Sequence, residues 1–379
     1  MQVKFNAIVA AALVTVGGAA LAQDVVKIGH VGPTSGAIAH LGKDNENGAR
    51  MAIDDLNAKG VTIGGKKVKL ELDAEDDGAD PKQGTAVAQK LVDAKVAGVV
   101  GHLNSGTTIP ASKIYFDAGI PQISPSATNP KYTRQGFNTA FRVVADDVHL
   151  GSTLGKYGVK ELGGKTFAVI DDRTAYGQGV AEEFSKAVKA AGGTIAETQF
   201  TTDKATDFTA ILTQIKSKKP DVVFFGGMDA VAGPMIRQMK QLGINAKFMG
   251  GDGICSSELP KLSGGAMADG QVVCAEAGGV EGEQKIGMDN FRDAYKKKFG
   301  IDVQVYAPYV YDAVNVLVAA MVKAGSSDPK VYLPVLAKTS GYKGVTGTIA
   351  FDERGDIKNG ALTLYTYKGD KRDQIAVVR

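Results

Sequence analysis

The chain is predicted to form an α/β protein with two doubly wound parallel-sheet lobes, joined by a hinge that the chain crosses several times. Short apolar strands alternate with helical stretches from Val25 onward, which is typical of a doubly wound sheet. The same alternation restarts near Ala145, after an irregular stretch. The length of 379 residues also exceeds what one hydrophobic core usually supports, so two lobes are expected.

The first 22 residues are typical of a secretory signal peptide. They hold one early lysine, Lys4, an apolar run over 7–16, and an A-x-A cleavage site directly before Gln23. The apolar run is too short to span a bilayer, and nothing downstream approaches about 18 uninterrupted apolar residues. We therefore expect cleavage after Ala22, export to a periplasm, and no membrane insertion.

The charge and the cysteine content exclude several classes of protein. The net charge of +3 falls to +2 when Lys4 is removed, so no overall field favours nucleic acid or anionic membrane. Cys255 and Cys274 are the only cysteines, and an oxidising compartment favours a disulfide between them over a metal site. Four scattered histidines without metal-binding spacing give no reason to expect a metal or any other cofactor.

The first lobe begins with the strand 25–33, a helical stretch to Lys59, the strand KKVKLELDAED, and a helix begun by Pro81. The glycines in KIGHVGPTSG lack the G-x-G-x-x-G spacing, and no acidic residue closes the next strand as a dinucleotide site requires. A dinucleotide loop is therefore disfavoured.

Two hydroxyl-rich loops follow neighbouring strands of this lobe, in the stretch 101–130. The loop after AGVVGHL carries Ser105 and Thr107 at the start of a helix expected over 107–118, and the loop after PQIS carries Ser126 and Thr128. Open α/β sheets bind ligands at the carboxyl ends of their strands. A helix start with short hydroxyls suits a small anion such as a carboxylate, although an ordinary Ser/Thr helix cap has the same pattern.

The second lobe repeats part of this order. A shift of 124 residues aligns Val99 with Val223 and Pro110 with Pro234 on a shared order of strand, loop, helix and strand. In that register the loop at Ser105 corresponds to Asp229, and the loop at Thr128 corresponds to Asp252. One lobe would supply hydroxyl donors and the other carboxylates. An Ala/Gly-rich chain also produces such matches by chance.

The chain continues past the second lobe with helices expected over 291–299 and 309–322, a short helix after Pro329, and two closing strands, ALTLYTYKG and QIAVVR. These helices are expected to cover the first sheet. The predicted division is a signal peptide, 1–22; the N-terminal lobe, 23–144 and 279–351; and the C-terminal lobe, 145–278 and 352–379.

The motifs together resemble one family. VVKIGHVGPTSG, DPKQGTAVAQKLV, GHLNSGTTIPAS, ISPSATNP, DRTAYGQGVA, FFGGMDAVAG, KFMGGDGI and VTGTIAFDERGD are similar to the periplasmic leucine/isoleucine/valine-binding proteins of branched-chain amino acid ABC transporters. The resemblance covers essentially the whole mature chain. It implies the type I periplasmic binding protein fold, a Venus-flytrap of two lobes.

The resemblance also implies roles for single residues. The carboxylate-binding serine of the family matches Ser105, its second-loop threonine matches Thr128, its closing-lobe tyrosine matches Tyr176, and its ammonium-binding acid matches Asp252. Other positions depart from the family: an alanine is Ser126, two pocket tyrosines are Leu41 and Met228, and Ala79 and Asn104 replace the cysteines that form the disulfide of enteric members. The full set of expected ligand-binding residues is Ser105, Thr107, Ser126, Thr128, Tyr176, Asp252, Leu41 and Met228.

These features predict a periplasmic solute-binding component, a monomer without enzymatic activity, that holds an apolar amino acid and passes it to a membrane permease. Leucine, isoleucine and valine are the first expectation. A receptor for another small solute, such as an aromatic amino acid, amide, urea or aromatic acid, is the alternative, although Asp252 favours a cationic ammonium. A secreted hydrolase with a metal on Asp76, Asp77 and Asp80 is disfavoured, because no G-x-S-x-G motif is present and an acidic cluster before Pro81 is typical of a turn.

Overall fold

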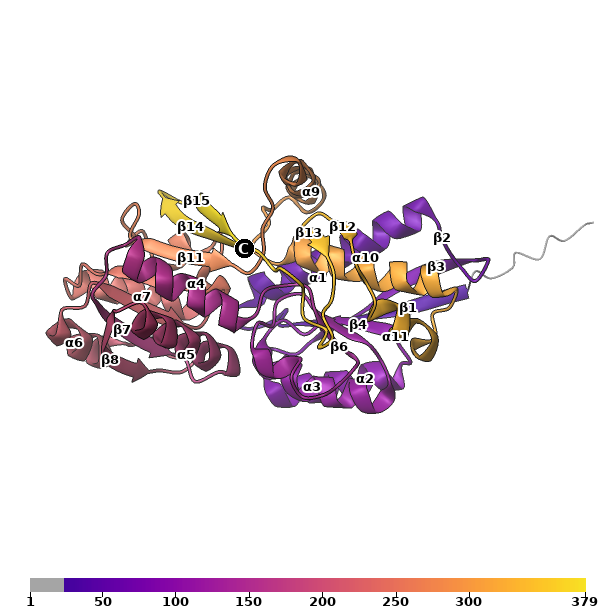
Figure 1. The fold of residues 1–379 in the computed structure, drawn as a ribbon, viewed down its shortest axis with the longest axis horizontal. Helices are drawn as coiled ribbons and strands as arrows, with labels where there is room; N and C mark the ends of the chain where they lie inside the picture. The colour runs from indigo at the N-terminus through magenta and orange to yellow at the C-terminus, as the bar shows by residue number, and fades with distance from the viewer. Residues whose placement is uncertain (1–23) are drawn as a thin grey trace, which may run out of the picture.

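The computed structural model describes residues 24–379 and places them in two α/β lobes that lie side by side (Figure 1). The predicted signal peptide and its cleavage site lie outside the described residues. In the described part of the chain, every helix is too short or too polar to cross a membrane.

The first lobe is built on a six-stranded sheet with the order β2-β3-β1-β4-β5-β6. All its neighbouring strands are parallel except β2 and β3. The strands are β1 Asp24–Gly32, β2 Val61–Ile63, β3 Lys66–Asp76, β4 Gly98–Gly101, β5 Gln122–Ser124 and β6 Ala140–Arg142.

Helices cover both faces of this sheet, as the alternation of buried residues requires. In β4, Val99 packs with α2 (Pro81–Asp93) and α3 (Ser105–Ala118), whereas the next residue, Val100, packs on the opposite face with α1 (Ala39–Lys59) and α10 (Ala307–Ala324). Successive side chains of a strand point to opposite faces, so both must be apolar here. Figure 1 shows α2 and α3 on one side of these strands and α1 and α10 on the other.

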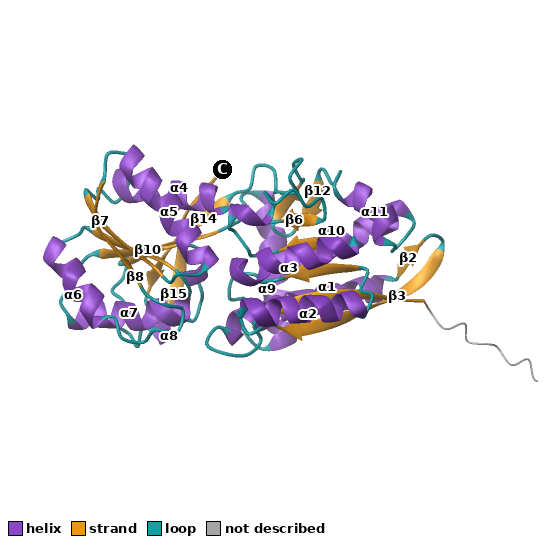
Figure 2. Ribbon diagram, turned by 90° about the horizontal axis from the view of Figure 1, so that it is seen from below, coloured by secondary structure: helices purple, strands orange, loops and turns teal. Residues whose placement is uncertain are grey.

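The second lobe has a seven-stranded sheet with the order β15-β14-β11-β10-β9-β7-β8, and Figure 2 shows it between two helical layers. One layer holds α4 (Asp147–Lys160) and α5 (Ala175–Ala190), and the other holds α6 (Thr209–Lys218), α7 (Asp229–Gln241) and α8 (Leu259–Leu262). The strands are β7 Thr166–Asp171, β8 Thr194–Phe200, β9 Val222–Gly226, β10 Lys247–Gly250, β11 Val272–Glu276, β14 Leu362–Lys368 and β15 Lys371–Val378.

The two sheets repeat one topology. The orders β3-β1-β4-β5-β6 and β8-β7-β9-β10-β11 place equivalent strands in the same sequence. Pro110 and Pro234 occupy the sixth position of α3 and α7, and Gly119 and Gly243 follow the two helices with φ of 70° and 68°. The register of 124 residues therefore matches equivalent positions of two similar lobes.

The chain passes between the sheets through three segments, 143–146, 277–282 and 350–361. Between the second and third segments, α9 (Glu283–Phe299) and α10 pack against α1, and α11 (Pro329–Leu336) packs against α10. A small sheet of β12 (Tyr342–Gly344) and β13 (Gly347–Ile349) follows. The residue limits given above for the two lobes stay a prediction.

Several helices begin earlier than expected. The structure starts α3 at Ser105, α9 at Glu283 and α10 at Ala307, whereas the sequence pattern indicated 107, 291 and 309. For α9 and α10 the expected start was the first clearly periodic aromatic residue, and for α3 it was Thr107, within the run of hydroxyl residues. The polar or proline-containing first turn carries no such signal, and helix ends are the least certain part of a sequence-based assignment.

Candidate functional site between the lobes

Asp252 is the centre of a buried polar cluster in the cleft between the lobes. It begins the short 3-10 segment Asp252–Ile254 directly after β10 and is only 1% exposed. Its Oδ1 accepts a hydrogen bond of 2.9 Å from the hydroxyl of Tyr176, and its Oδ2 accepts one of 2.9 Å from Tyr306. Burial raises the pKa of Asp252 to about 6, since a desolvated carboxylate is costly.

Tyr306 comes from the first lobe and was not among the expected site residues. It precedes α10, whose start is fixed by Asp44 of α1. The Asp44 carboxylate accepts hydrogen bonds from four consecutive backbone N–H groups, at 304–307, over 2.8 to 3.1 Å. This clamp places the Tyr306 hydroxyl on Asp252 of the opposite lobe.

Asp147 is a second carboxylate of the cleft that the sequence argument missed. It opens α4, is fully buried, and neither of its side-chain oxygens has a hydrogen-bond partner among the described residues. Burial, with the nearby charge of Asp252, raises its pKa well above the ordinary value. The hydroxyl of Thr128 lies near enough to lower this pKa but forms no hydrogen bond of normal geometry with the carboxyl group. A buried carboxyl group so poorly partnered is costly, so its position suits a further donor.

The two expected hydroxyl residues of the first lobe lie at this cluster. Ser105 is the first residue of α3, and its Oγ accepts a 3.2 Å hydrogen bond from the backbone N–H of Asn129. Thr128 is fully buried, its carbonyl accepts the N–H of Asp147 at 2.8 Å, and its hydroxyl has no hydrogen-bond partner in the described chain. Because the α3 cap residue, Asn104, makes no side-chain capping bond, the start of α3 can still accept an anion.

Two other expected residues point elsewhere. Thr107 lies two positions after Ser105, on the other side of α3, where its side chain packs against Gly84 of α2 and donates to the carbonyl of Asn104. The hydroxyl of Ser126 donates to the carbonyl of Leu103 and ties the second loop to the first. Both side chains are engaged within the protein. Thr107 and Ser126 could therefore contact a ligand only through their backbone groups, and such a contact stays a prediction.

Leu41 and Met228 bring apolar groups from the two lobes. Leu41 is fully buried in α1, and Met228 precedes α7 and is partly buried against the same hydrophobic core cluster. The sulfur of Met228 lies beside Gly253, directly after Asp252. Met228 therefore places a flexible apolar group beside the residue that follows Asp252, whereas Leu41 is buried within the core cluster.

The lobes are in direct contact around this cluster. The side-chain amide of Asn129 donates a 2.7 Å hydrogen bond to the carbonyl of Ala175 at the start of α5. On the opposite side His40 of α1 pairs with Asp229 of α7. The arrangement is therefore a closed one, in which Tyr306 also contacts Asp252, and Thr128 contacts Asp147, across the lobe boundary.

The expected disulfide borders this site, because the backbone N–H of Cys255 donates to the carbonyl of Asp252, whereas the acidic cluster lies apart from it. The structure joins Cys255 and Cys274 within the core of the second lobe. Asp80 caps α2, Asp76 binds the N–H groups of Thr34 and Gly78, and Asp77 pairs with His102. These acids therefore stabilise turns, and the residues described hold no cluster suited to a metal ion.

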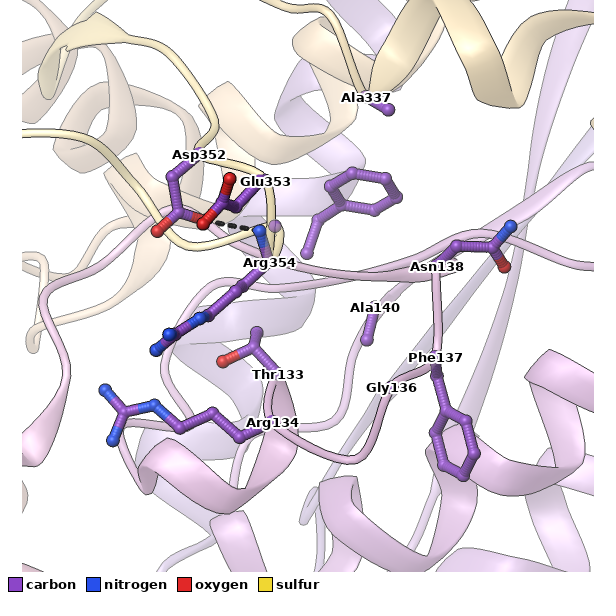
Figure 3. A pocket seen from close by; sticks show the side chains of 12 residues that line it. Thr133, Arg134, Gly136, Phe137, Asn138, Ala140, Ala337, Asp352, Glu353 and Arg354 are labelled. Carbon is purple, nitrogen blue, oxygen red and sulfur yellow. Dashed lines mark hydrogen bonds between the residues drawn. The ribbon is translucent and has the colours of Figure 1, made fainter.

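A cavity of about 600 Å³ lies near the third crossing segment, between residues 133–141 and 352–355 (Figure 3). Arg134 and Arg354 extend in the same direction at one end, and Phe137 lies at the other. None of the expected ligand-binding residues lines it. It is separate from the cluster around Asp252.

The fold and this cleft match one known family. The model of the periplasmic binding protein family matches residues 25–372, nearly all of the described chain. The chain belongs to this family. The family is one of solute-binding proteins rather than of enzymes.

Several proteins whose names or bound molecules identify a ligand are similar to this chain over most of its length. A Leu/Ile/Val-binding protein homologue of Brucella abortus is 37% identical over 366 residues, 96% of this chain and 95% of that protein. A leucine-, isoleucine-, valine-, threonine- and alanine-binding protein of Pseudomonas aeruginosa is 35% identical and covers 92% of each chain. The solved structure of a branched-chain amino acid substrate-binding protein of Streptococcus pneumoniae, in complex with isoleucine, superposes with a TM-score of 0.83 at 28% identity, covering 94% and 99% of the two chains.

The two missed residues carry only weak sequence signals. Asp147 is the second acid of FRVVADD and lies in a segment between the lobes, where no strand end marks a ligand loop. Tyr306 precedes a long apolar helix, which gives it the appearance of a packing residue. The one available signal is that Asp147 follows Asp146, a good helix cap, so that a second acid in the first turn is not needed for capping.

Proposed function

We propose that this periplasmic binding protein holds an apolar L-amino acid between its lobes and delivers it to the permease of an ABC transporter. The observation that carries the proposal is the pairing of opposite chemistries across the cleft: hydroxyls and a helix start on one lobe, and two carboxyl groups, Asp252 and Asp147, on the other. An α-amino acid carries a carboxylate and an ammonium group on the same carbon atom, and these two groups complement the two sides. Each charge is then buried only together with its partner.

The α-carboxylate is assigned to the first lobe. Ser105 at the start of α3 and the unpartnered hydroxyl of Thr128 supply donors, and the N-terminal end of the helix dipole favours a negative charge. Ser126 contributes by holding the second loop against the first, through its bond to the carbonyl of Leu103.

The α-ammonium is assigned to the second lobe. Asp147 has two buried oxygens free of protein donors, and Asp252 lies close enough for its charge to affect Asp147. A cation between them would lower both raised pKa values and allow both groups to ionise. Tyr176, bonded to Asp252 and to the N–H of Gly253, keeps the carboxylate in this orientation.

The ligand side chain is assigned to the apolar region of Leu41 and Met228, which favours leucine, isoleucine and valine. The relatives from Brucella abortus and Pseudomonas aeruginosa bear names for these ligands, and the Streptococcus pneumoniae relative holds isoleucine. Closure around the ligand would present a distinct surface to a permease, because ligand shifts the lobes toward the state that it binds more tightly. The proposed location is the periplasm, after removal of the signal peptide at Ala22.

A panel of the twenty amino acids tests this function. Thermal shift should show stabilisation by leucine, isoleucine or valine, and calorimetry on the stabilising ligands should give one site per chain. The Asp147→Asn variant should lose this stabilisation, while an exposed control, Asp370→Asn, should keep it. Stabilisation by an uncharged amide or an aromatic acid, with none by any amino acid, would assign the protein to another solute.

A further inference from the structure

His40 and Asp229 connect the lobes by a side-chain contact that the proposed ligand site does not use. His40 is the second residue of α1 in the first lobe, and Asp229 is the first residue of α7 in the second lobe. The His40 Nε2 atom lies 2.7 Å from Asp229 Oδ2. The same oxygen accepts a hydrogen bond from the hydroxyl of Ser256, which fixes the carboxylate from its own lobe.

We propose that His40 and Asp229 form an interlobe latch, so that ligand is held more tightly when His40 is protonated. The proposal rests on the proposed function only in that ligand is bound by the closed form. In the open form the lobes separate, and His40 loses Asp229. Protonation therefore favours closure, and by linkage it favours whatever the closed form binds.

The surroundings of His40 support this direction. The Asp229 side chain is fully buried, whereas that of His40 is 23% exposed, so a proton can reach the imidazole in the closed form. The charged groups that act on it are all acidic: Asp229 on α7, Glu258 before α8, and Asp44 on its own helix. Although burial alone would lower the pKa of His40, the bond to Asp229 and these charges raise it.

A second contact between the lobes lies next to the latch. The hydroxyl of Ser257 donates a 2.7 Å hydrogen bond to Gln304 in the segment that Asp44 clamps. Residues 256–258 of the second lobe thus meet α1 and the start of α10 together. Release of His40 would therefore weaken the contacts between the lobes that also place Tyr306 on Asp252.

Two other groups of the site, Asp252 and Asp147, titrate with the opposite effect, because burial raises the pKa of both carboxyl groups. The raised pKa of Asp252 means that acid removes the charge that would bind an ammonium. The latch contribution is therefore fully present below about pH 6.5, the ordinary pKa of histidine, and is lost as the pH rises through the raised pKa of His40. The loss at Asp252 sets in as the pH falls through about 6. The two contributions are separated by substituting His40 alone.

Calorimetry with leucine, or with the amino acid that stabilises most, tests the latch from pH 8.5 to 6.5. The ratio of wild-type to His40→Gln affinity should rise severalfold toward pH 6.5, because both proteins keep Asp147 and Asp252 and differ only at His40. Ser256→Ala, in place of the wild type in this ratio, should weaken the rise, because Asp229 loses its second anchor. His149→Gln is the matched control, since His149 is also half-buried but lies on α4, away from the contact, and this variant in the same ratio should keep the full rise.

A ratio of wild-type to His40→Gln affinity that stays constant from pH 8.5 to 6.5 overturns the latch while amino-acid binding stands. If no amino acid binds at any pH, the proposed function fails, and small-angle X-ray scattering then tests the latch alone. The radius of gyration of the unliganded wild type should fall between pH 8.5 and 6.5, and that of His40→Gln should not. Equal behaviour of the two proteins overturns the proposal.

Discussion

The hydroxyl of Tyr306 donates a hydrogen bond of 2.9 Å to Asp252 across the boundary between the lobes. Asp252 follows a strand of the second lobe, whereas Tyr306 is fixed by the clamp that Asp44 forms in the first lobe. The carboxylate assigned to the ligand ammonium is therefore oriented by both lobes at once, with Tyr176 on its other oxygen. Closure completes the geometry of this acid, so binding and closure are expected to be coupled.

Asp252→Asn should weaken amino-acid binding by about 2 to 5 kcal/mol, the range measured when one partner of a buried charge pair is removed. The amide keeps the shape of the side chain but carries no charge for the ammonium. Calorimetry at pH 7.5 measures the loss. Tyr306→Phe is the matched variant, because it removes one hydrogen bond and leaves the charge, so its effect should be smaller. An unchanged dissociation constant for Asp252→Asn would contradict the ammonium role.

Tyr176→Ala should weaken binding mainly through faster dissociation. Tyr176 is the second residue of α5 in the second lobe, and its hydroxyl donates to Asp252 and accepts from the N–H of Gly253. Because the first lobe is assigned the ligand carboxylate, Tyr176 acts on the ligand only after closure. Tyr176→Phe, which keeps the ring but not the hydroxyl, separates packing from hydrogen bonding. Stopped-flow fluorescence gives both rates, and slower association with unchanged dissociation would argue against a role in the closed state.

The fold and one side of the site could be predicted because their signals are local. The alternation of strands and helices gave the two lobes, and Ser105 and Thr128 each follow a strand directly, so that the sheet brings them together. Thr107 was assigned because a short hydroxyl at a helix start suits a small anion. Its place two residues into the helix turns its side chain to α2, which helical periodicity determines but a run of hydroxyl residues conceals.

The other side of the site depends on contacts between distant parts of the chain. Tyr306 reaches Asp252 only because the chain returns to the first lobe after residue 282. That return was expected, but no local pattern indicates which of the returning residues meets Asp252. Asp147 resembles any acid in the first turn of a helix, and its buried, unpartnered state exists only after the lobes pack. The contact between His40 and Asp229 has the same origin.

Cys255 and Cys274 should resist thiol labelling in the exported, unreduced protein after denaturation, and two reactive thiols would contradict the disulfide. The bridge spans 19 residues, so replacing both cysteines with serine should lower the free energy of unfolding by about 3 kcal/mol on a chain-entropy estimate. Chemical denaturation measures this loss. Ligand affinity, normalised to folded protein, should change little, because Cys255 contacts Asp252 through its backbone N–H, which serine keeps, and not through its side chain.

The His40→Gln variant should bind amino acid less tightly as the pH falls through about 6. Burial raises the pKa of the unliganded Asp252 carboxyl group to about 6. Below this pH the group is protonated, and the proton competes with the ligand ammonium. The carboxylate form needed for binding is present above this pH and lost below it. Calorimetry at pH 7.5, 6.5 and 5.5 measures the trend. Affinity that stays constant to pH 5.5 would show that Asp252 does not carry the charge.

The last prediction concerns Leu41 and Met228, which replace two pocket tyrosines of the family that the sequence resembles. Both are flexible and apolar, and Met228 lies beside Gly253, next to the proposed ammonium site. The pocket should accept leucine, isoleucine and valine with similar affinity and should also admit phenylalanine, because each methylene is worth only about 1 to 3 kcal/mol.

Leu41→Tyr and Met228→Tyr should each narrow the pocket, lowering affinity for phenylalanine more than for valine. Calorimetry with the four ligands measures this selectivity. Equal losses for all four would mean that these side chains do not contact the ligand, and strong binding of glutamate or arginine without leucine would show that the pocket is not apolar.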